Sequence, residues 1–335
     1  MPAYQTLPRL PFATAPSPIE ALPRLSAALG GPQIFVKRDD TVGPAGGGNK
    51  ARKLEFLLAD AKAKGADVIL TCGALQSNHA RLTAACAAKV GIDCVLVLQD
   101  AVDWREPNYR ASGNMLLDPL LGAKVIVIDN SEDLLARLAL EADKLATAGR
   151  KPYAIPVGGS NALGSLGYVE CAREIAESGE TFDRIVLATG SGGTQAGLLL
   201  GAATFGIAAP ILGISVSKST EKQVTLVSGL IEAARVAQPD LGEVPVGKIL
   251  VDDRHYLPGY GIPNEAVREA LSLCARLEGL LLDPVYTGKG MVGLIAGIRE
   301  GSIGKDERVL FLHTGGSAGL YAYSEWLSKP PSSRI

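Results

Sequence analysis

The stretch Gly43-Pro44-Ala45-Gly46-Gly47-Gly48-Asn49-Lys50 is the most informative segment of this 335-residue sequence. The glycine-rich loop ends at Lys50, and residues 51–58 that follow have the apolar spacing of an amphipathic helix. An amine at the start of a helix lies near unpaired backbone N–H groups and the positive end of the helix dipole. Because that setting disfavours the ammonium form, we expect a lowered pKa for Lys50 and a nucleophilic amine.

The same loop does not fit a nucleotide-binding Walker A motif. Asn49 interrupts the required Gly-Lys pair, and Ala51 replaces the Ser or Thr that would hold magnesium. A solvated lysine in the first helical turn is the ordinary alternative for Lys50, yet a cation is unfavourable at that end of a helix. Since a locally unfavourable residue often marks function, the sequence favours Lys50 as a functional amine.

A second glycine-rich loop, Thr189-Gly190-Ser191-Gly192-Gly193-Thr194, lies far downstream. Its small residues allow backbone N–H groups to approach an anion at the start of a helix. Gln195 stands where a dinucleotide-binding fingerprint needs its third glycine, and the next strand ends without an acidic residue, so NAD is not expected. The loop alone fits a phosphate site and a plain tight turn equally well. Together with a nucleophilic lysine, it indicates pyridoxal 5'-phosphate (PLP) bound as a Schiff base.

Composition excludes several other classes of protein. The net charge is -2, with 33 basic and 35 acidic residues interspersed, so no basic surface indicates a nucleic-acid partner. Five cysteines without paired spacing are typical of reduced thiols in a cytoplasmic protein, and three scattered histidines predict no metal site. The uncharged segment 191–217 contains six glycines and Pro210, which favours a buried helix and strand over a membrane span. Residues 1–18 lack the apolar core of a signal peptide.

Short apolar runs alternate with helical patterns along the chain. We predict strands at Ile34–Arg38, Val68–Cys72, Cys94–Leu98, Lys124–Ile128, Tyr153–Pro156, Arg184–Ala188, Ile211–Val216 and Val309–His313. We predict helices at Arg52–Lys64, Asn78–Val90, Glu132–Ala148, Leu166–Glu177, Asn264–Glu278 and Gly290–Glu300. This alternation indicates an α/β fold with largely parallel sheets that helices cover on both faces. Eight strands fit one large sheet or two unequal ones.

The polar loops follow predicted strands, and ligands of open α/β sheets bind beyond the carboxyl ends of strands. Ser77-Asn78-His79 follows one strand and Thr314-Gly315-Gly316 follows the last, so these loops can meet in one crevice. Ser77 or Asn78 can equally cap a helix, which is compatible with ligand binding. Tyr286 can be a core aromatic, and we predict that His313 is a hydrogen-bonded core histidine.

Taken together, several segments resemble the family of D-cysteine desulfhydrase and 1-aminocyclopropane-1-carboxylate (ACC) deaminase. The resemblance runs from about Arg9 to Trp326, in consistent order. The segments that carry it are Gly47–Glu55, Gly73–His79, Pro156–Asn161, Gly259–Asn264, Asp283–Lys289 and His313–Gly316. The family belongs to the fold type II, tryptophan-synthase-β-like PLP enzymes. The resemblance implies two open, twisted, mainly parallel sheets flanked by helices, in a homodimer that acts on a small amino acid.

The resemblance also implies a domain division and a set of site residues. A large PLP-binding domain would comprise residues 1–50 and 161–335, and a small domain residues 51–160. The residues implied to bind the cofactor are Lys50, Asn78, Thr189, Gly190, Ser191, Gly192, Gly193, Thr194, Tyr286 and Thr314. Those implied to bind the substrate are Ser77, Asn78, His79, Tyr260 and Thr287, and the catalytic ones are Lys50, Ser77, Tyr260 and Tyr286. In this scheme Asn78 meets the ring hydroxyl, Thr314 faces the pyridine nitrogen and Ser77 binds the substrate carboxylate.

Two positions favour one reaction of the family. ACC deaminases carry Glu after the tyrosine and Leu before the paired glycines, where this sequence has Thr287 and Thr314. A carboxylate at the pyridine nitrogen makes PLP a stronger electron sink, whereas a hydroxyl is neutral. The resemblance therefore implies α,β-elimination of D-cysteine to pyruvate, ammonia and hydrogen sulfide, with Lys50 as general base.

Three alternatives remain open. L-cysteate sulfo-lyase has the same scaffold and expels sulfite, with Lys218 or Lys289 as the candidate cation for the sulfonate. ACC deaminase ranks third because of Thr287 and Thr314. A PLP-binding protein without turnover is the fourth, and the combination of Lys50, Ser77 and Tyr286 argues against it.

Overall fold

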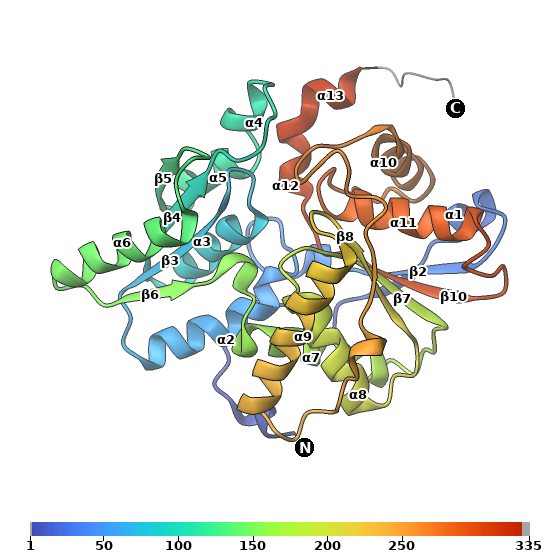
Figure 1. Ribbon diagram of the computed structural model, residues 1–335, viewed down its shortest axis with the longest axis horizontal. Helices are drawn as coiled ribbons and strands as arrows, with labels where there is room; N and C mark the ends of the chain where they lie inside the picture. The colour runs from blue at the N-terminus through green and yellow to red at the C-terminus, as the bar shows by residue number, and fades with distance from the viewer. Residues whose placement is uncertain (1, 330–335) are drawn as a thin grey trace.

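The computed structural model describes residues 2–329, which form two β-sheets with helices on both faces (Figure 1). The larger sheet has the order β1-β2-β10-β7-β8-β9, and the smaller one β5-β4-β3-β6. All neighbouring strands are parallel except β1, which pairs antiparallel with β2. The strands of the larger sheet are β1 (Ile19–Ala21), β2 (Gln33–Lys37), β7 (Arg184–Thr189), β8 (Ile211–Ser215), β9 (Leu250–Asp252) and β10 (Arg308–Leu312). Those of the smaller sheet are β3 (Val68–Ala74), β4 (Asp93–Gln99), β5 (Lys124–Ile128) and β6 (Pro152–Ile155).

The eight strands predicted from the sequence are confirmed, and they divide between two sheets. The sequence analysis missed β1 and β9. Both are edge strands of three residues, which is too short for a periodic pattern to show.

The larger sheet is covered by two groups of helices (Figure 1). One group is α1 (Pro23–Ala28), α10 (Glu265–Glu278) and α11 (Thr287–Arg299); the other is α7 (Ala162–Glu177), α8 (Gly193–Phe205) and α9 (Thr220–Ala237). Along β10, Val309 and Phe311 pack with the first group, and Leu310 and Leu312 with the second. Each buried strand is therefore apolar on both faces, as in other parallel sheets.

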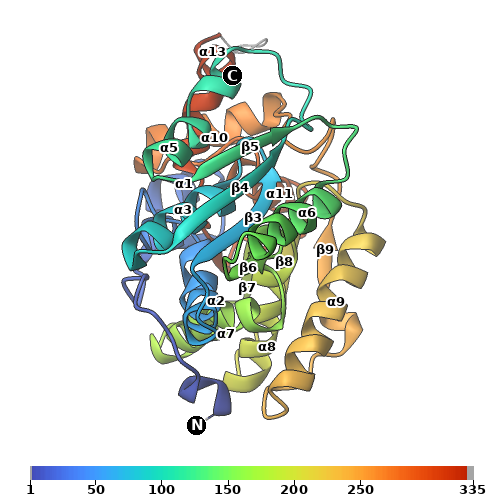
Figure 2. The ribbon, with the colours of Figure 1, turned by 90° about the vertical axis from the view of Figure 1, so that its left-hand side faces the viewer.

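The smaller sheet is covered in the same way (Figure 2). Helices α2 (Lys50–Ala63), α3 (Asn78–Val90) and α5 (Asn114–Leu120) share one core, and α6 (Leu134–Thr147) closes the other face. Shorter helices complete the chain: α4 (Asn108–Ala111), α12 (Ser317–Leu320), α13 (Ser324–Ser328), η1 (Ala3–Thr6), η2 (Asp39–Thr41), η3 (Val157–Gly159), η4 (Val246–Lys248) and η5 (Tyr321–Tyr323).

Three long helices differ from the expectation. Helix α7 begins at Ala162 rather than Leu166, because the side chain of Asn161 accepts a hydrogen bond from the Gly164 N–H and caps an earlier, glycine-containing turn. Helix α11 likewise begins before the predicted Gly290, and α9 was not predicted. The uncharged segment 191–217 forms α8 and β8, and no helix in residues 2–329 is long and apolar enough to cross a membrane.

Helix α2 joins the two sheets because it packs closely against α7. A Cβ on Gly167 of α7 would lie 2.4 Å from the carbonyl oxygen of Arg52, so only glycine permits this backbone approach. The sequence analysis divides the chain into residues 1–50 with 161–335 and residues 51–160, and this division places a boundary beside the contact. Residues 1 and 330–335 lie outside the described residues.

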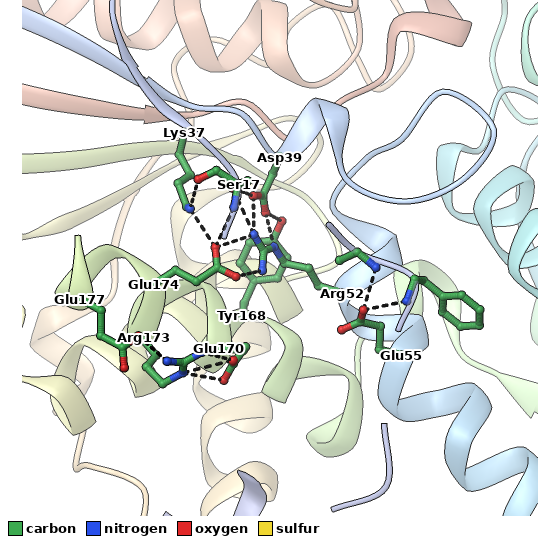
Figure 3. A network of polar contacts seen from close by, with 12 residues as sticks. Ser17, Lys37, Asp39, Arg52, Glu55, Tyr168, Glu170, Arg173, Glu174 and Glu177 are labelled. Atoms are coloured by element: carbon green, nitrogen blue, oxygen red, sulfur yellow. Dashed lines mark hydrogen bonds and ion pairs between the residues drawn. The ribbon is translucent and has the colours of Figure 1, made fainter. Parts of the chain in front are cut away.

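A buried ion cluster lies at this helix contact (Figure 3). The Arg52 guanidinium lies 2.8 Å from an Asp39 carboxylate oxygen and 2.6 Å from one of Glu174. Lys37 adds a second cation 2.8 Å from Glu174, and Tyr168 donates a hydrogen bond to Asp39 at 2.6 Å. The two cations and two carboxylates balance, which is the condition for burying charge at tolerable cost. The cluster fixes the first turn of α2, and Lys50 lies in that turn.

Candidate active site

The carboxyl ends of strands from both sheets surround a cavity of about 310 Å³. Most of its lining residues come from the ends of β3, β4, β6, β7, β8 and β10 and the loops that follow, as expected for an open α/β fold. Among the predicted site residues, the structure brings together Lys50, Ser77, Asn78, His79, Thr189, Gly190, Ser191, Gly192, Thr194, Tyr260, Tyr286 and Thr314. Gly193 and Thr287 are not among the lining residues.

Lys50 is the first residue of α2 and reaches the cavity. Its Nζ donates a hydrogen bond of 2.8 Å to Oδ1 of Asn49. Burial lowers the pKa of Lys50 to about 8; the positive charge of Arg81 adds to this effect, and the carboxylate of Asp283 opposes it. The direction agrees with the expectation from the sequence. The largest cause, however, is desolvation rather than the helix start.

The lowered pKa of Lys50 predicts how the rate of PLP incorporation depends on pH. An amine attacks an aldehyde only when it is neutral, and the neutral fraction of Lys50 rises as the pH passes about 8. We expect the rate of PLP incorporation into the apoprotein, followed by absorbance, to rise with pH and level off above about 8. A rate that keeps rising toward the ordinary lysine value of 10.5 would contradict this assignment.

The second glycine-rich loop forms a cradle at the N-terminus of α8. Asn49 donates to the Thr194 hydroxyl at 3.0 Å, and Gln223 donates to that of Thr189 at 3.0 Å. Each hydroxyl therefore keeps its own proton for another acceptor. Ser191 and Ser160 share a hydrogen bond of 2.8 Å at the edge of the loop. The start of a helix with such donors suits an anion.

Lys53 is a residue of this cradle that the sequence analysis missed. It is fully buried, and its Nζ donates to the Gly158 carbonyl at 3.2 Å and to Ser160 at 3.0 Å. A Cβ on Gly193 would lie 2.8 Å from this Nζ, so the amine lies directly behind the loop. Burial and the charge of Lys50 hold the pKa of Lys53 well below its usual range, so a bound anion there would be needed to favour its charged form.

Helix α3 presents its first residues to the cavity. The hydroxyl of Ser77 accepts the Ala80 N–H at 3.1 Å and caps the helix, which leaves the hydroxyl proton free. Thr71 donates to the Ile155 carbonyl at 2.9 Å, so Nε2–H of His79 must donate to the Thr71 oxygen at 2.8 Å. Burial and two nearby lysines hold the pKa of His79 well below its usual range, and the imidazole is neutral.

Two tyrosines from different segments meet in the cavity that Lys50 also lines. The hydroxyls of Tyr260 and Tyr286 lie 2.5 Å apart, and their rings pack edge to face at 5.8 Å between centroids. Burial raises the pKa of both hydroxyls, so both remain protonated near neutral pH. Lys289 supports this pair, because its Nζ donates to the carbonyls of Tyr256 and Gly259 in the loop that carries Tyr260.

The two threonines predicted to matter occupy different environments. Thr314 lines the cavity just after β10. Thr287 is fully buried outside it, with its hydroxyl donating to the Asp283 carboxylate at 2.7 Å. This position corrects the expectation that Thr287 touches the substrate: the side chain instead anchors the start of α11. His313 is confirmed as a hydrogen-bonded core histidine, bonded to the Leu281 carbonyl and the Gly315 N–H.

The family model described as pyridoxal-phosphate dependent enzyme matches residues 10–315. The chain belongs to that family. A solved structure of an ACC deaminase homologue is 38% identical, covers 96% of each chain and superposes with a TM-score of 0.88. A PLP-dependent aspartate racemase (14% identity, 90% of each chain, TM-score 0.65) and an O-ureido-L-serine synthase (19% identity, 95% of this chain and 94% of that one, TM-score 0.63) share the fold. The expected fold type II architecture is confirmed.

The residues of this PLP-dependent enzyme fit the cofactor. A phosphate is held by the backbone N–H groups of residues without bulky side chains. The loop has little room for a side chain at Gly190, where a Cβ would lie 3.1 Å from Val216. Gly193 is equally restricted by Lys53 and Ser160. The cradle from Thr189 to Thr194 with Lys53 could hold the phosphate, and Lys50, which lines the same cavity, could hold the aldehyde carbon.

Proposed function

We propose that this enzyme catalyses α,β-elimination of D-cysteine to pyruvate, ammonia and hydrogen sulfide. The composition of the cavity wall carries the proposal. The wall includes a lysine of lowered pKa, and none of the residues that line the cavity is Asp or Glu. The nearby Asp283 carboxylate is turned to the start of α11, where it accepts four hydrogen bonds. A site without a carboxylate for the pyridine nitrogen suits a reaction with a good leaving group better than ring opening.

The positions of the side chains support the following proposed roles. Bound PLP would withdraw electrons from Cα of the substrate. Lys50 would remove the Cα proton, and Ser77 with the first N–H groups of α3 would bind the substrate carboxylate. The protonated Tyr260–Tyr286 pair would donate to the departing thiolate. Loss of the proton and the thiolate leaves 2-aminoacrylate, and one water converts it to pyruvate and ammonia.

Two other activities have a specific observation in their favour. L-cysteate carries a sulfonate, and Lys218 lines the cavity with its Nζ 3.3 Å from the Gly190 carbonyl oxygen and from the Ser217 hydroxyl oxygen. Lys289, the other cation considered, is bonded to two backbone carbonyls and does not line the cavity. ACC deaminase activity is favoured by the 38% identity to a solved ACC deaminase homologue.

A product assay separates the three activities. We expect the purified enzyme with added PLP to release pyruvate and sulfide in equal amounts from D-cysteine. Pyruvate with sulfite from L-cysteate, and no sulfide from D-cysteine, would instead establish the sulfo-lyase. Release of 2-oxobutyrate from ACC as the main activity would establish the deaminase. If none of the three substrates yields a 2-oxo acid, the result would favour a PLP-binding protein without turnover.

We also propose that the enzyme is a cytoplasmic homodimer. The five cysteines, all free and buried, are compatible with a reducing compartment. The dimer follows from the family resemblance, and light scattering of the purified holoenzyme would test it.

A further inference from the structure

A chain of three buried or half-buried side chains leads from the glycine-rich loop to the cavity. Arg81 on α3 is 1% exposed and donates to the carbonyls of Ala45 and Gly47 at 2.7 and 2.9 Å. Its Nε also donates to Oδ1 of Asn114 on α5 at 3.1 Å. The amide nitrogen of Asn114 then donates to Oδ1 of Asn78 at 2.9 Å.

The direction of each hydrogen bond in this chain is forced. A guanidinium has only donors, so the atom of Asn114 that faces Arg81 must be its oxygen. The backbone carbonyl of Gln76 only accepts, and it faces the Asn114 nitrogen at 3.1 Å. Two independent partners therefore fix the amide of Asn114, which is fully buried. Since its nitrogen also faces Asn78, the Asn78 atom there must be the oxygen.

The consequence concerns the other end of the Asn78 amide. With Oδ1 committed to Asn114, the NH₂ group is the free end, and no residue in the range 2–329 accepts a hydrogen bond from it. Asn78 lines the cavity. A free amide would turn to suit whichever partner arrives, whereas this one presents a donor in advance. A fixed donor suits a cofactor oxygen that carries negative charge.

We propose that Arg81 and Asn114 are positioning residues that hold the Asn78 amide with its N–H group toward the cofactor. The inference rests on the proposed assignment of Asn78 to the ring hydroxyl of PLP. Because Arg81 also binds the Ala45 and Gly47 carbonyls, the same guanidinium sets the loop that precedes Lys50. Arg81 thereby helps to position both Lys50, which would hold the aldehyde carbon, and Asn78, which would meet the neighbouring ring oxygen.

The substitution Asn114→Asp tests this chain. An aspartate still accepts from Arg81 and gives the buried guanidinium a counter-charge, which offsets the lost hydrogen bond to the Gln76 carbonyl, and the thermal midpoint checks that the fold persists. The aspartate cannot donate to Asn78, however, whose amide must turn and present its oxygen to the cavity. We expect the dissociation constant of PLP to rise about tenfold, which is the loss of one hydrogen bond to a charged acceptor. We also expect the pH midpoint of the visible absorbance of the bound cofactor to shift upward, because the ring oxygen loses its donor.

A double-mutant cycle with Asn78→Ala separates positioning from a general structural effect. If Asn114 acts through Asn78, Asn114→Asp should change the PLP dissociation constant less than twofold in the Asn78→Ala background. The same tenfold loss in both backgrounds, or none in the wild type, overturns the proposal. If Asn114→Asp does not fold to a wild-type thermal midpoint, Asn114→Ala replaces it in the same cycle.

The single variant Asn78→Ala keeps the two hypotheses distinguishable. Unchanged PLP affinity and spectrum in Asn78→Ala would reject the assignment of Asn78, and the relay with it. Weakened affinity in Asn78→Ala with no effect of Asn114→Asp would reject the relay alone. Neither readout depends on turnover of D-cysteine, so a different substrate would leave the test intact.

Discussion

Replacing Lys50 by alanine is expected to reduce pyruvate release from D-cysteine by at least about 10²–10⁴-fold, the typical contribution of a positioned general base. The amine has one side-chain hydrogen bond, to Asn49, so the fold should not depend on it. The measurement is pyruvate release by the purified variant with added PLP, together with the thermal midpoint of the apoprotein. The visible absorbance of covalently bound cofactor should also disappear.

The matched control is Lys62→Ala, which removes an exposed lysine from the same helix. Its turnover and absorbance should equal those of the wild type. Full activity in the Lys50→Ala variant would reject the mechanism. A collapse of the thermal midpoint in that variant would show a structural role for Lys50 that the geometry does not predict.

Replacing Arg52 by alanine is expected to lower the free energy of unfolding by about 3–5 kcal/mol, because it leaves the buried carboxylates of Asp39 and Glu174 without their shared partner. Chemical denaturation of the apoprotein measures this loss. The control Arg299→Ala breaks a surface ion pair with Glu269, in which Arg299 is 53% exposed, and should cost less than about 1 kcal/mol. Equal losses in the two variants would show that the buried cluster contributes no more than a surface pair.

The sequence was sufficient for the parts of the site that local pattern determines. Lys50, the loop from Thr189 to Thr194 and the start of α3 each combine a strand or loop with a helix start, and such signals lie within a few residues of one another. The eight predicted strands were long enough to show their apolar runs. The three-residue strands β1 and β9 gave no such signal.

The parts that were missed depend on contacts between distant segments. Arg52 and Lys53 resemble a solvated charged turn in the sequence, yet both are buried. Arg52 lies against Glu174 of α7, and Lys53 lies behind the loop at Gly193. Asn114 is 36 residues from Asn78, so no local pattern connects their amides. Thr287 aligns with a position that distinguishes members of the family, but its hydroxyl is taken by Asp283, a pairing that only the three-dimensional structure shows.

The close contact at Gly167 limits how this enzyme can be altered. Within four consecutive residues, helix α2 carries Arg52 of the buried ion cluster and the two lysines that we propose for chemistry and for the anion, Lys50 and Lys53. Its backbone touches α7 without an intervening side chain, so it cannot shift to absorb a substitution. Changes on this helix should therefore alter activity and stability together. In α6, by contrast, Leu134 lines the cavity but the later residues pack on the far side of the smaller sheet, so substitutions there can change stability alone.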